Sequence, residues 1–367
     1  MFNTLKQVGA KFRLPGTIYS YNTITLGNIN ATYKVTYRRA DKTLKSYLFQ
    51  RVNTYVFKNP EQIMENIDKV TSFIRENYPD QPSLHFHHTE EGLNYYVYTD
   101  RADEAGYFWR VSNFIDSITF DSTDDLAVIA ATGEAFGHFQ MQLADFDGSS
   151  LHETIPDFHN TKKRLDTLFA DAERDAVGRR SEVEEELEYI RSVRDYASEL
   201  SIRLSRGELP TRVTHNDTKA NNVLFDRVTK RPIIVIDLDT VMPGMAMYDF
   251  GDAVRFIAST AVEDEPDLSR VFFDTAKFRA FAKGFIKEVR HALTAEEIDS
   301  LVQASFSITV ELAARFLDDY LNGDVYFKCN YPAHNLVRMR CQLQLAKDIM
   351  RKKDELQWII RDIMEQK

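Results

Sequence analysis

The spacing of apolar residues changes once along this chain, near residue 116, and the change restricts the folds open to it. Before it, short runs rich in β-branched and aromatic residues alternate with turn-forming stretches such as GNIN, which is typical of an antiparallel sheet. Helical spacing appears at the very start and again over residues 59–77, where Pro60 suits a first turn. Strands are expected within residues 17–26, 31–37, 46–52, 84–88, 94–99 and 107–115.

The rest of the chain reads as mainly helical, with apolar residues recurring every three or four positions. Two domains are expected, because single cores stop growing at about 250–300 residues and this chain has 367. The predicted fold class is therefore α+β, with a β-rich N-terminal lobe and a mainly helical C-terminal lobe. Helices are expected at residues 126–146, 181–204, 275–293 and 296–321.

Charge and composition narrow the classes of function. The formal net charge of −10 repels phosphate backbones and anionic lipid heads, so nucleic acid and membranes are poor candidate partners. No stretch has the length of a membrane span and the first residues lack a signal-peptide core, so a cytoplasmic protein is expected. Cys329 and Cys341 are the only cysteines and show no CxxC spacing, so both are expected to be reduced thiols.

The stretch VTHNDTKANNVLFD, residues 213–226, concentrates polar side chains between two short apolar runs. Within it His215, Asp217, Lys219 and Asn222 form an HxDxKxxN arrangement, and the apolar run PIIVIDLD that follows ends in Asp237 and Asp239. A turn and a strand end would account for any one of these residues. Their combination favours a site for phosphoryl transfer, a reaction that depends on positioning and on charge neutralisation.

Each residue of the motif has a physical role in such a site. Asp217 is predicted to be the catalytic base that accepts the acceptor's proton, and Lys219 to stabilise the transferring phosphate. Asn222 and Asp237 supply the oxygen ligands that magnesium prefers. His215 is expected to organise the loop through hydrogen bonds.

A second stretch, Asp249-Phe250-Gly251-Asp252, spells the DFG motif of protein kinases. It follows the loop VMPGMAMY instead of an apolar strand, so Asp237 fits the metal role better. We assign Asp249 the structural role of holding the catalytic loop from the start of its own helix.

The stretches HNDTKANNVLFD, IDLDTVMPG, DFGDAVRF, RFLDDYLNGDVYF and YPAHNLVRMR resemble the bacterial N-acetylhexosamine 1-kinases, in the aminoglycoside phosphotransferase and choline kinase-like superfamily. The resemblance runs from about residue 16 to the C-terminus. It implies a two-lobed protein-kinase-like fold, ATP with Mg²⁺, and phosphorylation of the anomeric hydroxyl of N-acetylglucosamine or N-acetylgalactosamine. It implies lobes at 1–112 and 118–367 joined by a hinge at 113–117.

The resemblance also assigns residues to ligands. Arg315 and Tyr326 are placed against the sugar, with Phe256 nearby; from the sequence alone, Arg315 fits an ion pair with Asp318 or Asp319 equally well. The backbone of the hinge, with Asn113, Phe114 and Ile115, is expected to hold the adenine edge.

The chain departs from the kinase pattern at two places. The third strand offers Gln50 and Arg51 where protein kinases carry a lysine; Gln50 is expected to face the nucleotide with Asp68 as its polar partner, and Arg51 to be solvated or bound to a carboxylate. The phosphate-covering loop TLGNINATY has one glycine, so Gly27 and Asn28 or Asn30 are expected to reach phosphate. The resemblance implies a histidine at the position of Asn28, near the sugar.

Three alternatives stay open. The first is a kinase of the same superfamily acting on another sugar, choline or an aminoglycoside; the second is a nucleotide-binding pseudokinase. The third is a carbohydrate-binding protein without catalysis. No protein partner is inferred. His85, His87 and His88 suggest a metal but lack a third ligand on one strand face, so they are read as structural, and the acidic stretch 259–270 as a mobile loop.

Overall fold

The computed structural model describes residues 1–25, 29–100 and 103–366, so Gly27 and Asn28 lie outside the described residues. The chain packs into two compact units. The first contains Met1–Ile118 with two short later segments, Leu151–Thr154 and Ile236–Val241; the second contains the remainder. No helix among the described residues is long and apolar enough to cross a membrane.

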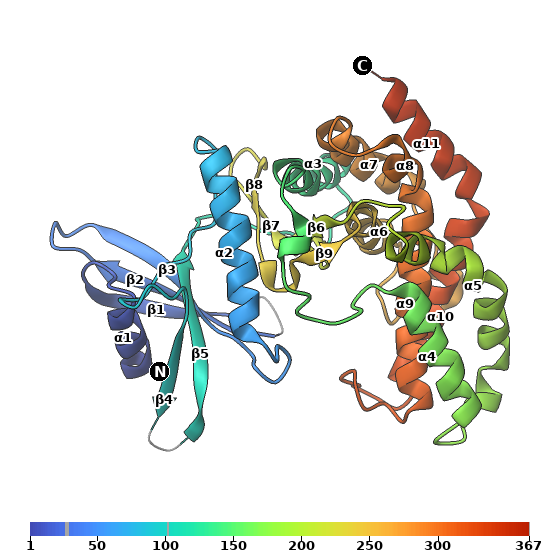
Figure 1. The fold of residues 1–367 in the computed structure, drawn as a ribbon, viewed down its shortest axis with the longest axis horizontal. Helices are drawn as coiled ribbons and strands as arrows, with labels where there is room; N and C mark the ends of the chain where they lie inside the picture. Colours follow the sequence, from blue (N-terminus) through green and yellow to red (C-terminus); the bar gives the residue numbers. More distant parts are fainter. Residues whose placement is uncertain (26–28, 101–102, 367) are drawn as a thin grey trace. The chain divides into compact units, whose positions relative to one another are not determined.

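The first unit is built on an antiparallel five-stranded sheet with the order β1-β2-β3-β5-β4 (Figure 1). Five of the six predicted strands are confirmed. The sixth prediction, 84–88, is wrong: Phe86 forms only an isolated bridge to Ser112, because this segment pairs briefly with the end of β5 that β4 does not reach. The elements are α1 (Phe2–Lys11), β1 (Thr17–Ile24), β2 (Ala31–Arg38), β3 (Leu44–Arg51), α2 (Pro60–Asn77), β4 (Tyr96–Asp100) and β5 (Asp103–Asn113).

The core of this unit lies between α1 and the sheet. Leu5 and Val8 of α1 are fully buried, and they belong to one cluster with aromatic side chains of the strands, including Phe49 and Trp109. Strand positions that alternate towards α1 are apolar, which is the pattern expected of a sheet with one covered face. This packing holds β2, β3 and β5 in register.

Asn66 on α2 joins the two short later segments to the first unit. Its Nδ2 donates to the carbonyls of His152 (2.8 Å) and Val241 (3.0 Å), and its Oδ1 accepts from the N–H of His152 (2.8 Å). The side chain is buried, so all three bonds form away from water, where an unpaired amide is costly. Segment 236–241, which carries Asp237 and Asp239, is therefore anchored to α2.

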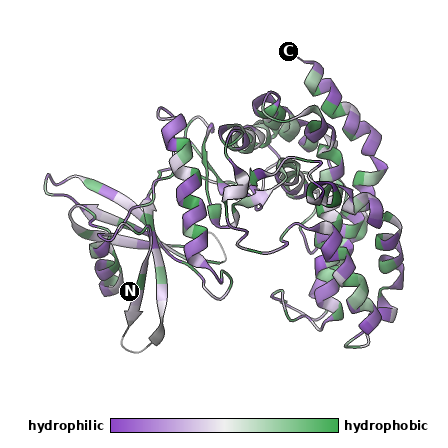
Figure 2. Ribbon diagram, in the orientation of Figure 1, coloured by the Kyte–Doolittle hydropathy of each residue, from purple (hydrophilic) through white to green (hydrophobic). Residues whose placement is uncertain are grey.

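The second unit is mainly helical, with two small antiparallel sheets, β6 with β9 and β7 with β8 (Figure 1). Hydrophilic residues recur along α5 and α11, at the edge of this unit in Figure 2. Its elements are α3 (Leu126–Gln142), α4 (Thr161–Arg174), α5 (Glu184–Ser205), β6 (Arg212–Thr214), β7 (Val223–Phe225), β8 (Pro232–Val235), β9 (Met242–Gly244), α6 (Ala246–Ile257), α7 (Thr275–Val289), α8 (Ala295–Asp299), α9 (Leu301–Leu321), α10 (His334–Arg351) and α11 (Lys353–Glu365).

The expected helix over 296–321 is interrupted. Thr294 and Glu297 form a capping box that starts the short α8, and Ser300 then separates it from α9. The hydroxyl of Ser300 donates to the carbonyl of Glu296 (2.8 Å), and such back-bonding competes with the backbone ladder. The backbone N–H of Ser300 donates to the same carbonyl (3.1 Å), and Ser300 is both the C-cap of α8 and the N-cap of α9.

Glycine permits the close approach of α3 and α7. A Cβ on Gly284 would lie 1.9 Å from the carbonyl oxygen of Ala130, and one on Gly133 would lie 2.2 Å from that of Phe281. Any larger residue would force the helices apart. The contact positions α3, whose Gln140 reaches the candidate site.

A carboxyl pair between α4 and α9 gives a pH-dependent stability. Burial, followed by a hydrogen bond that the protonated Asp318 donates to the Asp171 carboxylate, raises the pKa of Asp318 from 3.8 to about 7. The folded state therefore keeps a proton that the unfolded chain releases near its ordinary pKa, so folding stability falls as pH rises through that window. We expect Asp318→Asn to stabilise the protein at pH 8 by on the order of 1 kcal/mol.

The measurement is urea unfolding of both proteins at pH 5 and pH 8, and the stabilisation by Asp318→Asn should be larger at pH 8. Asp166→Asn provides the control, because Asp166 is half-exposed on α4 and pairs with a lysine and an arginine. This substitution should not stabilise the protein more at pH 8 than at pH 5. Equal effects of Asp318→Asn at the two pH values would contradict a raised pKa.

Candidate active site

The catalytic loop predicted from the HxDxKxxN motif lies in the second unit, between β6 and the short 3₁₀ turn η3 (Ala220–Asn222) that leads into β7. Asn216 has a φ of 64°, in the left-handed region that asparagine tolerates better than most residues. This turn follows directly from β6, so the N–H groups of His215 and Asn216 both point to one carboxylate. That carboxylate belongs to Asp249.

Asp249 lies in the first turn of α6 and is buried. It accepts hydrogen bonds from the backbone N–H of His215 (2.7 Å) and of Asn216 (2.8 Å), and from the side chain of Gln140 (2.7 Å). Burial raises the pKa of the Asp249 carboxyl, and the charge of His215 and these bonds oppose the rise. These are the contacts of a residue that holds the loop.

The glycine of the DFG spelling has a packing role. A Cβ on Gly251 would lie 2.9 Å from the backbone of Ala304 on α9, so only glycine lets α6 and α9 approach this closely. The stretch is helical throughout. The similarity to a protein-kinase DFG is therefore a coincidence of letters, as its position in the sequence suggested.

His215 is fully buried, with its ring edge-on to those of Phe136 and Phe139. Its Nδ1 accepts from the backbone N–H of Asp217 at 3.3 Å. The side chain lies beneath the loop and orients Asp217 through this bond.

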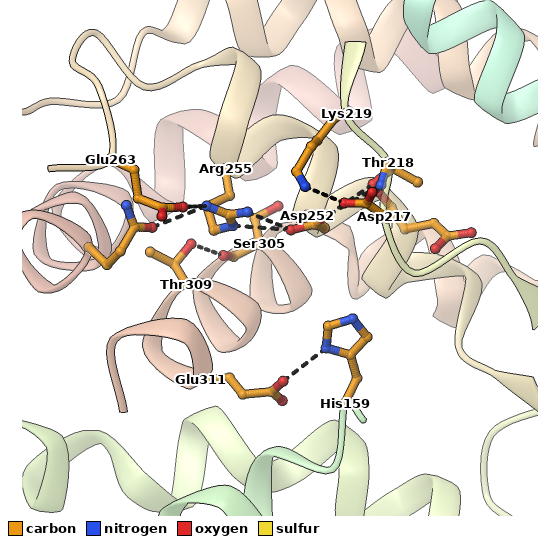
Figure 3. A network of polar contacts seen from close by, with 12 residues as sticks. His159, Asp217, Thr218, Lys219, Asp252, Arg255, Glu263, Ser305, Thr309 and Glu311 are labelled. Atoms are coloured by element: carbon orange, nitrogen blue, oxygen red, sulfur yellow. Dashed lines mark hydrogen bonds and ion pairs between the residues drawn. The ribbon is translucent and has the colours of Figure 1, made fainter. Parts of the chain in front are cut away.

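Asp217 is the focus of the polar contacts in the loop (Figure 3). Its Oδ1 lies 2.7 Å from Lys219 Nζ, and its Oδ2 accepts from Asn222 Nδ2 at 3.1 Å. Burial alone would lower the pKa of Lys219, but the charge of Asp217 and the hydrogen bond to it outweigh burial and raise it. Lys219 is thus a cation held beside a half-buried carboxylate.

Beneath this pair lies a second carboxylate that sequence reasoning missed. Asp252, one turn along α6 from Asp249, accepts from the backbone N–H of Thr218 (3.3 Å) and pairs with Arg255 (2.8 Å). Although burial raises the pKa of Asp252, the charge of Arg255 outweighs it and the pKa is lowered. The signal in the sequence was Asp252 and Arg255 at i, i+3 on one helix.

Arg255 also links the loop to the acidic stretch 259–270. Glu263 lies 3.7 Å from Arg255, and Asp264 lies 3.2 Å from the buried His334 of α10 (Figure 3 shows the first of these). These two contacts hold acidic residues of this stretch against α6 and α10. Its predicted mobility stays a prediction.

Arg315 lies on α9 with its guanidinium over two aromatic rings, Phe158 at 5.4 Å and Phe327 at 5.6 Å. Within the described residues no carboxylate lies within ion-pair distance of it. Asp319 instead accepts from the N–H groups of Val325, Tyr326 and Phe327. The alternative of a helical ion pair for Arg315 is therefore wrong, because backbone donors occupy Asp319 and Asp318 is hydrogen-bonded with Asp171.

Tyr326 and Phe256 are both in the second unit. The N–H of Tyr326 donates to Asp319 at 2.7 Å, its ring lies edge-on to Phe327, and the side chain is 72% exposed. Phe256 is half-buried near the end of α6. Their contacts with sugar stay predictions.

In the first unit, Gln50 lies directly across the sheet from Arg110. Its Oε1 accepts from Arg110 Nε (3.0 Å) and its Nε2 donates to Thr32 (3.4 Å). Arg110, buried on β5, pairs with the buried Asp239. A cation thus lies beside Gln50 on the neighbouring strand, and this cross-strand pairing is not readable from one strand. That Gln50 faces the nucleotide stays a prediction.

The structure gives the contacts of three other residues for which the sequence raised expectations. Asp68 lies 3.5 Å from His88, not from Gln50, because the α2 side chain reaches the 84–88 segment. Arg51 stacks over Tyr107 (4.8 Å) and does not bind a carboxylate among the described residues. The Asn30 side chain donates to Asp239 (2.7 Å) and accepts from the N–H of Asn53 (3.0 Å), so both ends of its amide are engaged.

The histidines of segment 84–88 have ordinary partners. His87 bonds to Asn113 (3.0 Å) and packs edge-on to His85. Burial lowers the pKa of both His85 and His87. Across residues 1–25, 29–100 and 103–366, no group of three or more histidine, cysteine, aspartate or glutamate side chains is arranged to hold a metal ion.

The hinge backbone is partly used by the sheet. The N–H of Asn113 donates to His85 (3.1 Å) and that of Phe114 to Ser46 (3.3 Å), while the Ile115 carbonyl accepts from Ser117 (3.1 Å). Adenine recognition by this backbone stays a prediction.

The proposed magnesium ligands belong to different units. Asn222 lies in η3, and because its Nδ2 donates to the carbonyl (2.8 Å) and carboxylate (3.1 Å) of Asp217, its Oδ1 is the atom suited to a cation. Asp237 follows β8 with a φ of 63°. Both supply hard oxygen donors, so the residues fit magnesium chemically.

The chain matches the family model described as "Phosphotransferase enzyme family" (APH) over residues 20–281, more than half of its 367 residues. It belongs to the APH phosphotransferase family. As a member of this family it is a small-molecule phosphotransferase, which agrees with the coarser part of the resemblance drawn from the sequence.

Solved structures of related kinases share the fold of this APH family member. A microcompartment-associated aminopropanol kinase is 13% identical with a TM-score of 0.59, over 96% of this chain and 98% of that one. The amicoumacin kinase hAmiN, solved with AMP-PNP, Ca²⁺ and Ami, is 11% identical with a TM-score of 0.57, over 93% and 92%. A choline kinase from Cryptosporidium parvum Iowa II is 14% identical with a TM-score of 0.53, over 99% and 96%. The predicted kinase-like α+β fold is confirmed.

Proposed function

We propose that this phosphotransferase uses ATP to phosphorylate the anomeric C1 hydroxyl of N-acetylhexosamines. The observation that carries the proposal is Arg315, a guanidinium without a carboxylate partner in the described part of the chain, lying over Phe158 and Phe327. A guanidinium fork binds pairs of hydroxyl or carbonyl oxygens, and aromatic faces cover the apolar side of a sugar ring.

The catalytic loop supplies the chemistry. The oxygen of the acceptor hydroxyl attacks the γ-phosphorus of ATP, and the bond between this phosphorus and ADP breaks. Asp217 accepts the proton that the hydroxyl loses. Lys219, 2.7 Å from Asp217, stabilises the charge on the phosphoryl oxygens. Asn222 and Asp237 would hold Mg²⁺, which when bound neutralises phosphate charge.

The alternative is a kinase for an amino alcohol, as the printed names of the aminopropanol and choline kinases suggest. Such acceptors are cationic. Arg164 lies near Arg315. Burial, followed by the charge of Arg315, lowers the pKa of Arg164. Within the described residues, no carboxylate lies within ion-pair distance of either arginine. Two arginines without such partners repel a cationic acceptor, so a neutral sugar is favoured.

The deciding experiment measures magnesium-dependent ADP release with N-acetylglucosamine, N-acetylgalactosamine, glucose, galactose, choline and an aminoglycoside, together with the reducing end of each sugar. ADP release with loss of the reducing end supports C1 phosphorylation. Release with the reducing end intact supports another hydroxyl, and release with choline alone supports the amino-alcohol alternative. Sugar binding that needs neither Mg²⁺ nor ATP would support a non-catalytic carbohydrate-binding protein.

Arg315→Met tests whether Arg315 binds the sugar, which is the observation on which the proposal rests. The variant keeps the apolar stem over the rings and loses the fork, so the KM for the sugar should rise about 10- to 100-fold, with little change in the KM for ATP. Arg279→Met removes an arginine that stacks on Trp358, and we expect it to leave both constants unchanged. An unchanged sugar KM in Arg315→Met would remove the support that Arg315 gives to the proposal.

A further inference from the structure

His159 precedes α4 in the second unit and is held by only one of its two ring nitrogens. Nδ1 lies 2.9 Å from Oε1 of Glu311 on α9. Nε2 is buried and has no hydrogen-bond partner among the residues that the structure describes. In Figure 3 the ring stands between Glu311 and the Asp217–Lys219 pair, with the second nitrogen on the side away from Glu311.

Glu311 fixes which nitrogen carries the proton. Its side chain is 1% exposed, and its Oε2 accepts from the hydroxyl of Thr161 at 2.7 Å. A buried carboxylate requires donors, so Nδ1 carries a hydrogen towards Oε1. In the neutral ring Nε2 is then a lone-pair acceptor.

The surroundings place this acceptor between the catalytic loop and Arg315. On one side lies Asp252, the carboxylate that holds the N–H of Thr218 next to Asp217 (Figure 3). On the other, its ring packs on Phe158 at 4.4 Å, the same ring that lies under Arg315. A ligand that reaches from Asp217 to Arg315 therefore passes His159.

We propose that His159 is a further acceptor-binding residue, and that its Nε2 accepts a hydrogen bond from a hydroxyl or amide N–H of the acceptor. This inference rests on the proposed function and adds a specificity element to the same site. A buried nitrogen without a partner gains one when a donor arrives, so the free site is complementary to a ligand with such a donor. Acceptors that lack the donor should bind more weakly.

A purely structural role makes a different prediction. In that case His159 only ties residues 155–160 to α9 through Glu311, and Nε2 is irrelevant. Two substitutions separate the roles. His159→Asn keeps an amide near the position of Nδ1 and removes Nε2, whereas His159→Gln places an amide near Nε2 and loses the bond to Glu311.

The experiment measures kcat, the acceptor KM, the ATP KM and the melting temperature of the full-length protein and both variants. The acceptor is whichever compound in the panel above gives turnover. We expect His159→Asn to raise the acceptor KM about 10-fold, equivalent to one hydrogen bond, with the ATP KM and melting temperature unchanged. His159→Gln should stay closer to wild type in acceptor KM. The inference would be overturned by a raised acceptor KM in His159→Gln alone. It would also be overturned by an equally raised acceptor KM in both variants together with lowered melting temperatures.

A second measurement keeps the inference separate from the identity of the acceptor. Nitrogen-15 NMR of histidine-labelled protein reports which ring nitrogen is protonated, and subtraction of the His159→Asn spectrum assigns the signal. A bare Nε2 supports the inference, and a protonated Nε2 in the neutral ring overturns it. If no compound in the panel is phosphorylated, that result counts against the proposed function, and the NMR result still decides the inference.

Discussion

Asp217→Asn should lower kcat by about 10²- to 10⁴-fold, because the amide cannot accept the proton of the acceptor hydroxyl. The substitution nearly preserves shape, and its Oδ1 can still accept from Asn222. The lost ion pair with Lys219 is partly exposed, with side-chain exposures of 42% and 29%. Folding stability should therefore change by less than about 1 kcal/mol, and the KM for ATP should change little.

Steady-state kinetics with the acceptor found above, combined with urea unfolding, checks this result. Asp226→Asn is the matched control, because Asp226 caps the exposed turn after β7 through bonds that asparagine can also accept. We expect wild-type turnover from it. Undiminished turnover in Asp217→Asn would refute the role of Asp217 as base, and a wild-type protein without turnover would point to the pseudokinase alternative.

Arg110→Met should destabilise the protein by about 3–5 kcal/mol, because it leaves Asp239 as a buried charge without its cation. The two side chains are 2% and 4% exposed. Asn30 would remain as the single polar side chain that the structure shows bonded to Asp239. Because Asp237 lies two residues away in the same segment, we also expect weaker binding of ATP in the presence of Mg²⁺.

Chemical unfolding measures this effect, with two further variants. Arg51→Met, on the neighbouring strand and stacked on Tyr107, should change stability by less than about 0.5 kcal/mol. Arg110→Met combined with Asp239→Asn removes both charges and should recover part of the loss. A loss below about 1 kcal/mol in Arg110→Met would show that water or another group solvates Asp239.

The local spacing of apolar residues was sufficient to predict most strands and helices of the fold. Alternation of apolar residues predicted β1, β2 and β3, and helical spacing with Pro60 predicted α2. The prediction at 84–88 was wrong because strand identity depends on how much of a neighbouring edge is free, and only Phe86 forms a bridge. The break between α8 and α9 at Ser300 was also missed, because the expected helix was drawn as one continuous span.

The sequence by itself determined which residues the loop brings together, since His215, Asp217, Lys219 and Asn222 occupy one short segment whose spacing is set by covalent geometry. Tertiary structure decided which distant groups complete it. Asp249 and Asp252 reach the loop from α6, Arg110 meets Asp239 from a position 129 residues away, and His159 meets Glu311 from 152 residues away. Such pairs leave no periodic signal, because buried polar groups select partners by proximity in the folded chain and not by spacing along it.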